Sequence, residues 1–248
     1  MSLNLIGLRT VATFSARKLL MNRRWALVVM LGALIALVMG YAATEDGANM
    51  HFASDLMAML LLAFLLPVLS LIYGASLIRN EMDDRSIVQV ITAPLDRRMS
   101  YLGYYLGLVM VLCVLISLVT AVGGLAFLAF SPERDGGVQL VLTFIALQCL
   151  GVLVYSALFL LLGTVLKQPI YLGLFYIFIW EGFVASVPGS IGEFTVRYQL
   201  QSVASELTDL GFVSSMPGNG ALAALALLLV TAALLGAGAF SLRKKEIS

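Results

Sequence analysis

Glu181 is the side chain best placed to carry chemistry, because it is the one acid inside a long apolar segment of this chain. An ionisable group in such a place costs about 2.5 kcal/mol or more and usually faces a helix bundle or a cavity. At about 1.5 Å per residue it lies about 16 Å into its segment, near the middle of a membrane. Four interpretations are open: a polar lining, a proton-sensitive gate, a structural hydrogen bond to a neighbouring helix, or a boundary position if the segment bends outward early.

A second group of candidate ligands surrounds the only histidine, His51. Met50 precedes it, Met57 and Met59 follow, and imidazole with thioether sulfur suits copper. However, Met57 and Met59 fall on different helical faces, and methionine commonly fills apolar cores. We therefore assign no metal ligand and leave open whether Met50 and His51 bind one.

Other catalytic patterns are missing from the sequence. Cys113 and Cys149 lie deep in apolar segments, which indicates neither a disulfide framework nor a C-x-x-C site. His51 and Asp55 could belong to a Ser/His/Asp site, but nothing positions a nucleophile. No Gly-Lys pair occurs, so the chain has no P-loop. We predict no catalytic residue and no cofactor in this chain; if ATP drives the protein, another chain binds it.

The composition is that of a polytopic membrane protein. The chain is 61% hydrophobic and 12% charged, whereas an ordinary soluble domain is about 45–50% apolar and about 25% charged. The net charge of +1 gives no basic field that would favour nucleic acid. The positions of the charges must therefore indicate the partners.

Apolar segments of membrane-spanning length position these residues. About 20 apolar residues cross the hydrocarbon core as a helix. The absence of period-two alternation argues against a barrel, so we predict an all-α fold with six transmembrane helices in a single transmembrane domain, residues 1–248. Pro67 lies inside the second span and should kink it. The predicted spans are residues 25–43, 56–78, 101–130, 138–166, 170–187 and 221–242.

Lys and Arg set the expected orientation, because cytoplasmic loops are enriched in them. Thirteen of the fifteen basic residues fall in the two termini and the second and fourth linkers, and only Arg134 and Arg197 fall on the opposite side. We therefore expect both termini and residues 79–100 in the cytoplasm, and residues 44–55, 131–137 and 188–220 outside.

Two segments outside the spans have helical patterns. In residues 1–24, Leu5, Leu8, Val11, Ala12 and Leu19 share one face, which predicts an amphipathic helix on the inner membrane surface. The alternative is an unstructured basic flank. Residues 188–220 should form an outer helical hairpin that dips partly into the outer leaflet, as a lid or as a passive surface element.

Small residues at four-residue spacing predict helix contacts. Gly32, Ala36 and Gly40 share a face of the first span, and Gly103 and Gly107 share one at the start of the third. Whether these contacts lie within one chain or between two is left open.

The linker at residues 79–98 gathers charge around a short apolar run. Asp83 or Asp84 can cap a helix, Ile87, Val88 and Ile91 form one apolar face, and Pro94 ends it. Such a helix suits a cytosolic protein partner. It could equally fold back onto its own bundle or onto lipid headgroups.

The order of Glu81, a short apolar helix, Pro94, two residues, Arg97 and an immediate span resembles the permeases of ABC exporters of the ABC-2 family. In that family the segment between the second and third spans is the coupling helix, which rests on the ATP-binding subunit. The usual pattern is Glu followed by Gly-Thr, then P-x-x-R and a Lys ten residues after the proline. This chain departs from it at Arg85-Ser86 and at Tyr104.

The run from "WEGFVASVP" to "RYQLQSVA" resembles the family's fifth span and outer hairpin, around Trp180, Glu181, Tyr198 and Leu200. The family has a similar acid there, which favours a structural or gating role for Glu181 over catalysis. Six spans, the surface helix and the long last outer loop also agree, so the resemblance covers the whole chain.

The resemblance implies a permease subunit of an ATP-driven ABC transporter, an exporter in a prokaryotic-type cytoplasmic membrane. Implied partners are a cytosolic ABC ATP-binding subunit that holds ATP and Mg, an identical or homologous second permease, and the lipid bilayer. The implied coupling residues are Glu81, Asp84, Arg85, Ile87, Val88, Ile91, Pro94 and Arg97.

Two other functions compete with this one. One is an intramembrane enzyme that uses Glu181, with His51 as a second group. The other is a secondary transporter that uses Glu181, although that class usually shows internal repeats with matched broken spans, and Pro67 has no counterpart here. The substrate is not indicated.

Overall fold

The computed structural model describes residues 2–21, 24–45, 48–83, 97–132, 134–186, 191–207 and 219–244. All regular structure in these ranges is helical, which confirms the all-α fold class. The elements in chain order are α1 (Ser2–Met21), α2 (Trp25–Ala42), α3 (Met50–Met57), the π-helix η1 (Ala58–Leu65), α4 (Leu66–Asp83), α6 (Arg97–Phe130), α7 (Gly137–Val165), α8 (Pro169–Phe175), the π-helix η2 (Tyr176–Phe183), the short 3₁₀ turns η3 (Val184–Ser186) and η4 (Gly192–Phe194), α9 (Val196–Leu207) and α10 (Gly220–Lys244).

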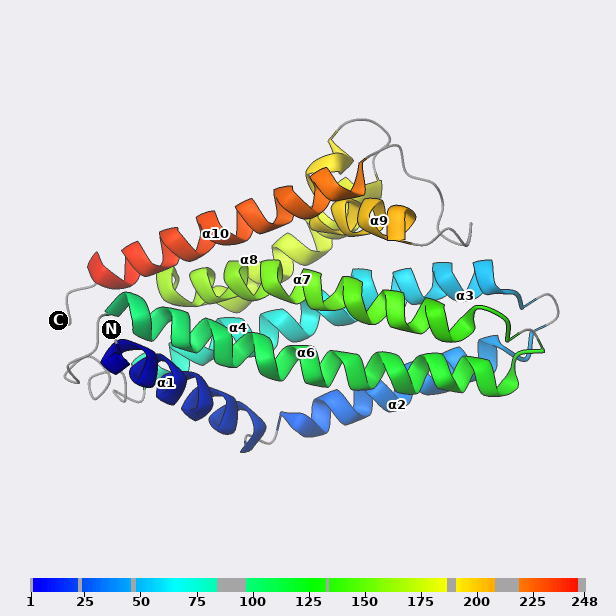
Figure 1. The fold of residues 1–248 in the computed structure, drawn as a ribbon, viewed down its shortest axis with the longest axis horizontal. Coiled ribbons are helices and arrows are strands. Elements are labelled where there is room, and N and C mark those ends of the chain that lie inside the picture. Colours follow the sequence, from blue (N-terminus) through cyan, green and yellow to red (C-terminus); the bar gives the residue numbers. More distant parts are fainter. Residues whose placement is uncertain are drawn as a thin grey trace.

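The antiparallel pair α6 and α7 forms the centre of the bundle (Figure 1). The Thr120 hydroxyl of α6 donates a hydrogen bond to the side chain of Gln148 of α7. Gly124, four residues later on α6, lies against Val141, seven residues earlier on α7. α1 and α2 pack on α6, α4 packs on α7, and α10 packs on both α6 and α7. The start of α1 and the end of α10 lie at one end of the bundle, and the α2–α3 and α6–α7 connections lie at the other.

Among the described residues, five helical runs are long and apolar enough to cross a membrane, and a sixth apolar run, Pro169–Phe183, is shorter. Each of the six predicted spans coincides with one of these runs. The largest difference is in the second run, which begins at Met50 instead of residue 56. The Asn49 side chain accepts a hydrogen bond of 2.9 Å from the Phe52 N–H, an N-cap that starts the helix early.

The second run is not a regular α-helix. The π-helix η1 precedes α4, and the Leu66 N–H donates to the Leu61 carbonyl, five residues back. Pro67 follows directly and has no N–H to donate. The expected distortion at Pro67 is therefore a π-helical segment on its N-terminal side. A second π-helix, η2, interrupts the fifth run without any proline inside it.

α1 packs along the first half of α6 (Figure 1). Val11, Ala12 and Leu19 of its predicted apolar face are buried. A Cβ at Gly103 would lie 2.8 Å from Val11, and one at Gly107 would lie 2.6 Å from the Ala12 carbonyl oxygen. These two glycines therefore admit α1 of the same chain, which answers the question that their spacing left open.

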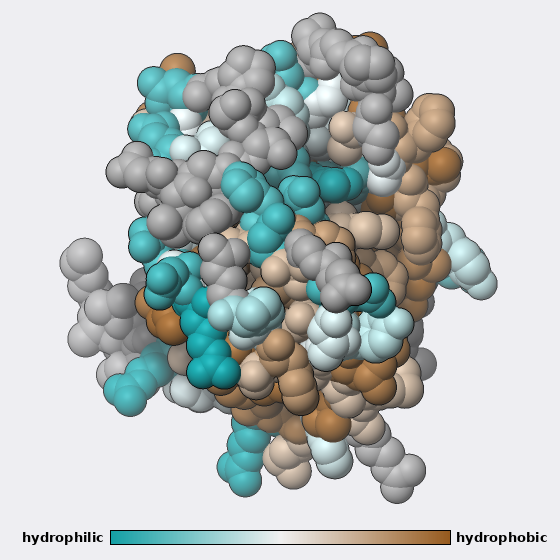
Figure 2. All heavy atoms as spheres, turned by 90° about the vertical axis from the view of Figure 1, so that its right-hand side faces the viewer, coloured by the Kyte–Doolittle hydropathy of each residue, from teal (hydrophilic) through white to brown (hydrophobic). Residues whose placement is uncertain are grey.

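Polar and apolar residues are separated on the surface. Figure 2 looks onto the end of the bundle that carries the α2–α3 and α6–α7 connections, where hydrophilic residues gather, while hydrophobic residues cover the flank on its right and below. Large apolar side chains are exposed along the helices. Examples are Met30 and Leu37 on α2, Met110 and Leu125 on α6, and Leu229 on α10. Such a surface suits lipid around the flanks and water at the end.

Candidate functional site

Glu181 lies in η2 with 2% of its surface exposed, and both of its carboxylate oxygens accept hydrogen bonds. The Tyr176 hydroxyl donates to Oε1 at 2.8 Å, and the Val196 N–H donates to the same oxygen at 3.0 Å. The Arg197 N–H donates to Oε2 at 3.1 Å. The acid is thus fully engaged by groups of its own chain.

Two of these donors are the first backbone N–H groups of α9. Such groups have no partner inside the helix and carry its positive dipole end, so a carboxylate is the natural acceptor. Thr195 adds a second cap, because its Oγ1 accepts from the Tyr198 N–H at 3.3 Å. Glu181 therefore joins the fifth apolar run to the helix of the predicted outer hairpin.

The hairpin helix reaches deep into the bundle. Leu200 of α9 is fully buried and lies against Gly151 of α7 and close to Leu66. Gly151 is fourteen residues from the start of α7 at Gly137, about 21 Å along the helix, so α9 packs well inside the length of α7. The described part of the predicted hairpin contains the helix α9, and the hairpin itself stays a prediction.

Aromatic rings support the acid from the α7 side. Tyr176 meets Phe159 edge-on with ring centroids 6.3 Å apart, and Phe159 stacks on Tyr155 at 6.0 Å. Tyr155 and Phe159 are both fully buried on α7. This packing fixes the Tyr176 ring, and with it the hydroxyl that donates to Glu181.

A second acid caps the next helix. The Glu206 Oε2 of α9 accepts from the Ala221 N–H of α10 at 3.0 Å, and Asn219 accepts from the same N–H at 3.0 Å. Each end of α9 is therefore tied through a carboxylate to one of the two runs that flank the hairpin, η2 at its start and α10 at its end.

This geometry favours a structural or gating role for Glu181 over catalysis. Its oxygens are occupied, and none of the donors named above is His51, which lies exposed in the first turn of α3. Within the described ranges no group of three or more His, Cys, Asp or Glu residues could hold a metal ion. Met50 and Met57 are buried core residues, whereas Met59 is exposed.

The candidate coupling residues fall mostly beyond the described residues. Glu81 belongs to the last turn of α4 and Arg97 begins α6, and both helix ends lie at the end of the bundle where α1 starts (Figure 1). Asp84, Arg85, Ile87, Val88, Ile91 and Pro94 lie outside the described residues. Their assignment stays a prediction.

A side-chain contact between α2 and α4 was not predicted from the sequence. The Arg24 guanidinium, at the start of α2, donates to the Ile72 carbonyl at 3.2 Å and to the Ser76 hydroxyl of α4. The sequence pattern had assigned Arg24 only to the basic flank that sets orientation. Ser76 lies five residues before Glu81, so the contact ties α2 to α4 just ahead of the predicted coupling segment.

The donors to Glu181 were also missed. Tyr176 lies five residues before the acid, on the same helical run, and Val196 and Arg197 lie fifteen and sixteen residues after it. A tyrosine near an intramembrane acid is a usable signal. Backbone N–H groups have no signature in the sequence beyond a helix start, here marked by Thr195.

The comparison with protein families agrees with this architecture. A family model described as "ABC-2 family transporter protein" matches residues 2–247. No curated protein matches the chain. Because the match covers nearly every residue, the chain belongs to the ABC-2 family of transporter proteins, as a membrane-spanning permease.

Proposed function

We propose that this permease couples ATP hydrolysis by a separate cytosolic ABC ATP-binding subunit to export of a substrate. The observation that carries the proposal is the match of the ABC-2 family to residues 2–247. ATP and Mg would be held by the partner, since this chain has no Gly-Lys pair. A second permease, identical or homologous, would complete the pathway.

The proposal places six spans in the membrane. The run Pro169–Phe183 joins the five longer ones as the fifth span in chain order. The start of α1 and the end of α10 share one end of the bundle, as an even number of crossings requires (Figure 1). Both termini and residues 79–100 would then be cytoplasmic, and the hairpin would lie on the outer side.

The proposed coupling contact lies between α4 and α6. Ile87, Val88 and Ile91 would insert into the ATP-binding subunit, and the polar residues Glu81, Asp84, Arg85 and Arg97 would flank them, with Pro94 ending the helix. The hydrogen bonds from Arg24 to Ile72 and Ser76 would transmit a displacement of the coupling segment from α4 to α2. At the far side, the Glu181 cap would hold the hairpin as an outer lid.

The decisive test is the double variant Ile87→Asp, Ile91→Asp in the full chain. A carboxylate pressed unpaired against an apolar socket costs several kcal/mol, so the ATP-binding subunit should no longer copurify, and its ATPase rate should no longer respond to the permease. Membrane insertion should be normal, because no span is changed. Arg98→Ala, a single change at the membrane edge, is the control and should disturb the topology or the helix position only mildly.

A double variant that inserts normally, retains the ATP-binding subunit and still transports would contradict the assignment of the coupling helix. A purified chain that hydrolyses ATP without a partner would contradict the proposal that a separate subunit binds ATP. Substrate transport that needs only an ion gradient would favour the secondary-transporter alternative.

A further inference from the structure

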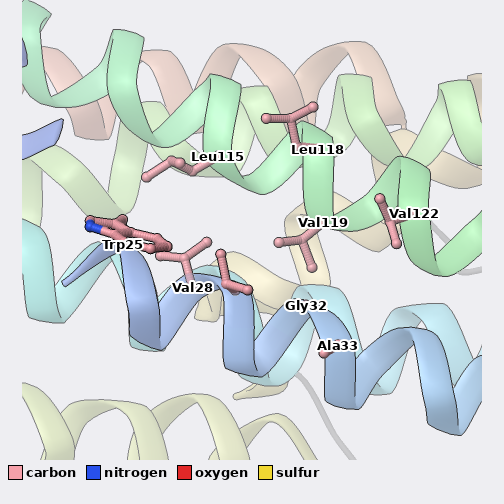
Figure 3. Close-up of a pocket in the computed structure, with 9 residues that line it drawn as sticks. Trp25, Val28, Gly32, Ala33, Leu115, Leu118, Val119 and Val122 are labelled. Carbon is pink, nitrogen blue, oxygen red and sulfur yellow. The ribbon is translucent and has the colours of Figure 1, made fainter. Parts of the chain in front are cut away.

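A groove runs between α2 and α6 on the exposed lateral surface of the helix bundle (Figure 3). It has a volume of about 570 Å³. Trp25, Gly32 and Ala33 of α2 form one wall, and Leu118 and Val122 of α6 contribute to the other. The surface of the groove is almost entirely carbon, so its occupant presents no polar group at this depth.

The groove continues a surface that already faces lipid. Both helices are membrane-spanning candidates of high hydropathy. Val29 on α2 and Leu118 and Val122 on α6, all lining residues, are 52–59% exposed. Beside them, Met30 and Leu125 are 66% and 59% exposed. The groove is thus a hollow in the hydrocarbon-facing flank of this protein.

Its length and its aromatic end match one leaflet. Trp25 is the first residue of α2, and Ala33 follows eight residues later, about 12 Å along the axis. Half of a hydrocarbon core of about 30 Å is about 15 Å. Tryptophan prefers the interface between headgroups and acyl chains, and the Trp25 ring lies at one end of the groove (Figure 3).

A helix from a second copy fits this groove less well. Helices associate closely in lipid through small residues or polar side chains at the contact. Gly32, the small residue here, is already used within the chain, because a Cβ on it would lie 3.3 Å from Val119. The α6 wall consists of Leu and Val residues. A flexible acyl chain can follow such an irregular apolar wall, whereas a helix needs a complementary ridge.

We propose that the α2–α6 groove binds one acyl chain of a membrane phospholipid from the leaflet on the α1 side. The bound chain fills the hollow along Gly32 and Ala33, and its headgroup lies at the level of Trp25. The inference is independent of the ATPase partner and of the substrate. It assigns this protein a lipid site distinct from the Glu181 region.

Native mass spectrometry of the purified full chain, delipidated and then supplied with palmitoyl-oleoyl phosphatidylglycerol, tests the site. We expect one tightly retained phospholipid per chain. Ala33→Phe should fill the groove and reduce retention at least fivefold. Ala232→Phe is the matched control, because Ala232 is exposed on α10, and it should behave as the unchanged chain. Val122→Phe fills the groove from the opposite wall and replaces Ala33→Phe if that variant does not fold.

Tryptophan fluorescence gives an independent measurement, because the chain has only two tryptophans. With Trp180→Phe in the background, Trp25 is the sole reporter, and phosphatidylcholine with brominated acyl chains should quench it in a saturable manner. Equal quenching in the presence and absence of Ala33→Phe would mean general lipid contact and would overturn the site. Quenching that disappears as the protein concentration rises would mean a second copy covers the groove, which also overturns it.

Discussion

At the level of single residues, the two oxygens of Glu181 accept hydrogen bonds from the Tyr176 hydroxyl and from the backbone N–H groups of Val196 and Arg197. Glutamine keeps one acceptor oxygen, whereas leucine leaves two backbone N–H groups and a hydroxyl buried without partners, at about 1–3 kcal/mol each. We therefore expect Glu181→Leu to lower transport and thermal stability strongly, and Glu181→Gln to lower both less. Transport into vesicles and thermal unfolding in detergent measure the two effects.

Tyr176→Phe is the control for this series, because it removes one donor and leaves both N–H groups in place. Equal loss of transport with Gln and Leu, at normal expression, would mean that charge matters more than hydrogen bonding. Full activity with Leu would remove Glu181 from the site.

Glu181 could be singled out from the sequence because a lone acid in an apolar segment is conspicuous. Its structural role could not, since Val196 and Arg197 contribute backbone atoms that any residue has. Arg197 had been placed in the predicted outer helical hairpin. Its backbone N–H donates to a buried carboxylate, because α9 packs against α7 and α10 inside the bundle.

At the level of elements, the contact between α1 and α6 depends on Gly107. Gly107→Val would place a Cβ about 2.6 Å from the Ala12 carbonyl oxygen, which a backbone atom cannot relieve by rotating. Overpacking of this kind costs about 1–3 kcal/mol. Gly236→Val is the matched control, because a Cβ at Gly236 would meet nothing within 4 Å. Thermal unfolding in detergent should show a lower midpoint for Gly107→Val alone.

If the two glycine variants unfold at the same temperature, α1 does not pack on α6 in solution. In that case residues 1–24 would be better described by the predicted helix on the membrane surface, or by its alternative, a basic flank, than by a helix packed on α6.

Most elements were predictable because apolar length alone identifies a spanning helix. The bounds of α7, Gly137–Val165, differ by one residue at each end from the predicted span. The π-helix at Tyr176–Phe183 was not predictable, because its sequence contains no proline and no other marker of a π-helical register. The coupling helix stays a prediction.

At the level of the whole molecule, the distribution of basic residues predicts the orientation in the membrane. Thr44 follows α2 at one end of the bundle, and Ser86 lies in the linker proposed for the opposite side. In a chain without Cys113 and Cys149, a membrane-impermeant maleimide applied to intact cells should label Thr44→Cys and not Ser86→Cys. We expect this result because thirteen of the fifteen Lys and Arg residues fall in segments on the predicted cytoplasmic side and only two fall on the other side. Labelling of Ser86→Cys from outside would reverse the orientation, and labelling of both would contradict the span count.

The order in which the chain is synthesised gives the Glu181 cap a further consequence. Glu181 leaves the ribosome fifteen residues before Val196 and sixteen before Arg197. Until Val196 and Arg197 have emerged as well, the acid lacks these two N–H donors. In the described part of the chain the fifth run, Pro169–Phe183, is also the shortest of the six apolar runs. We therefore expect the fifth run, α9 and α10 to reach their final packing together instead of helix by helix.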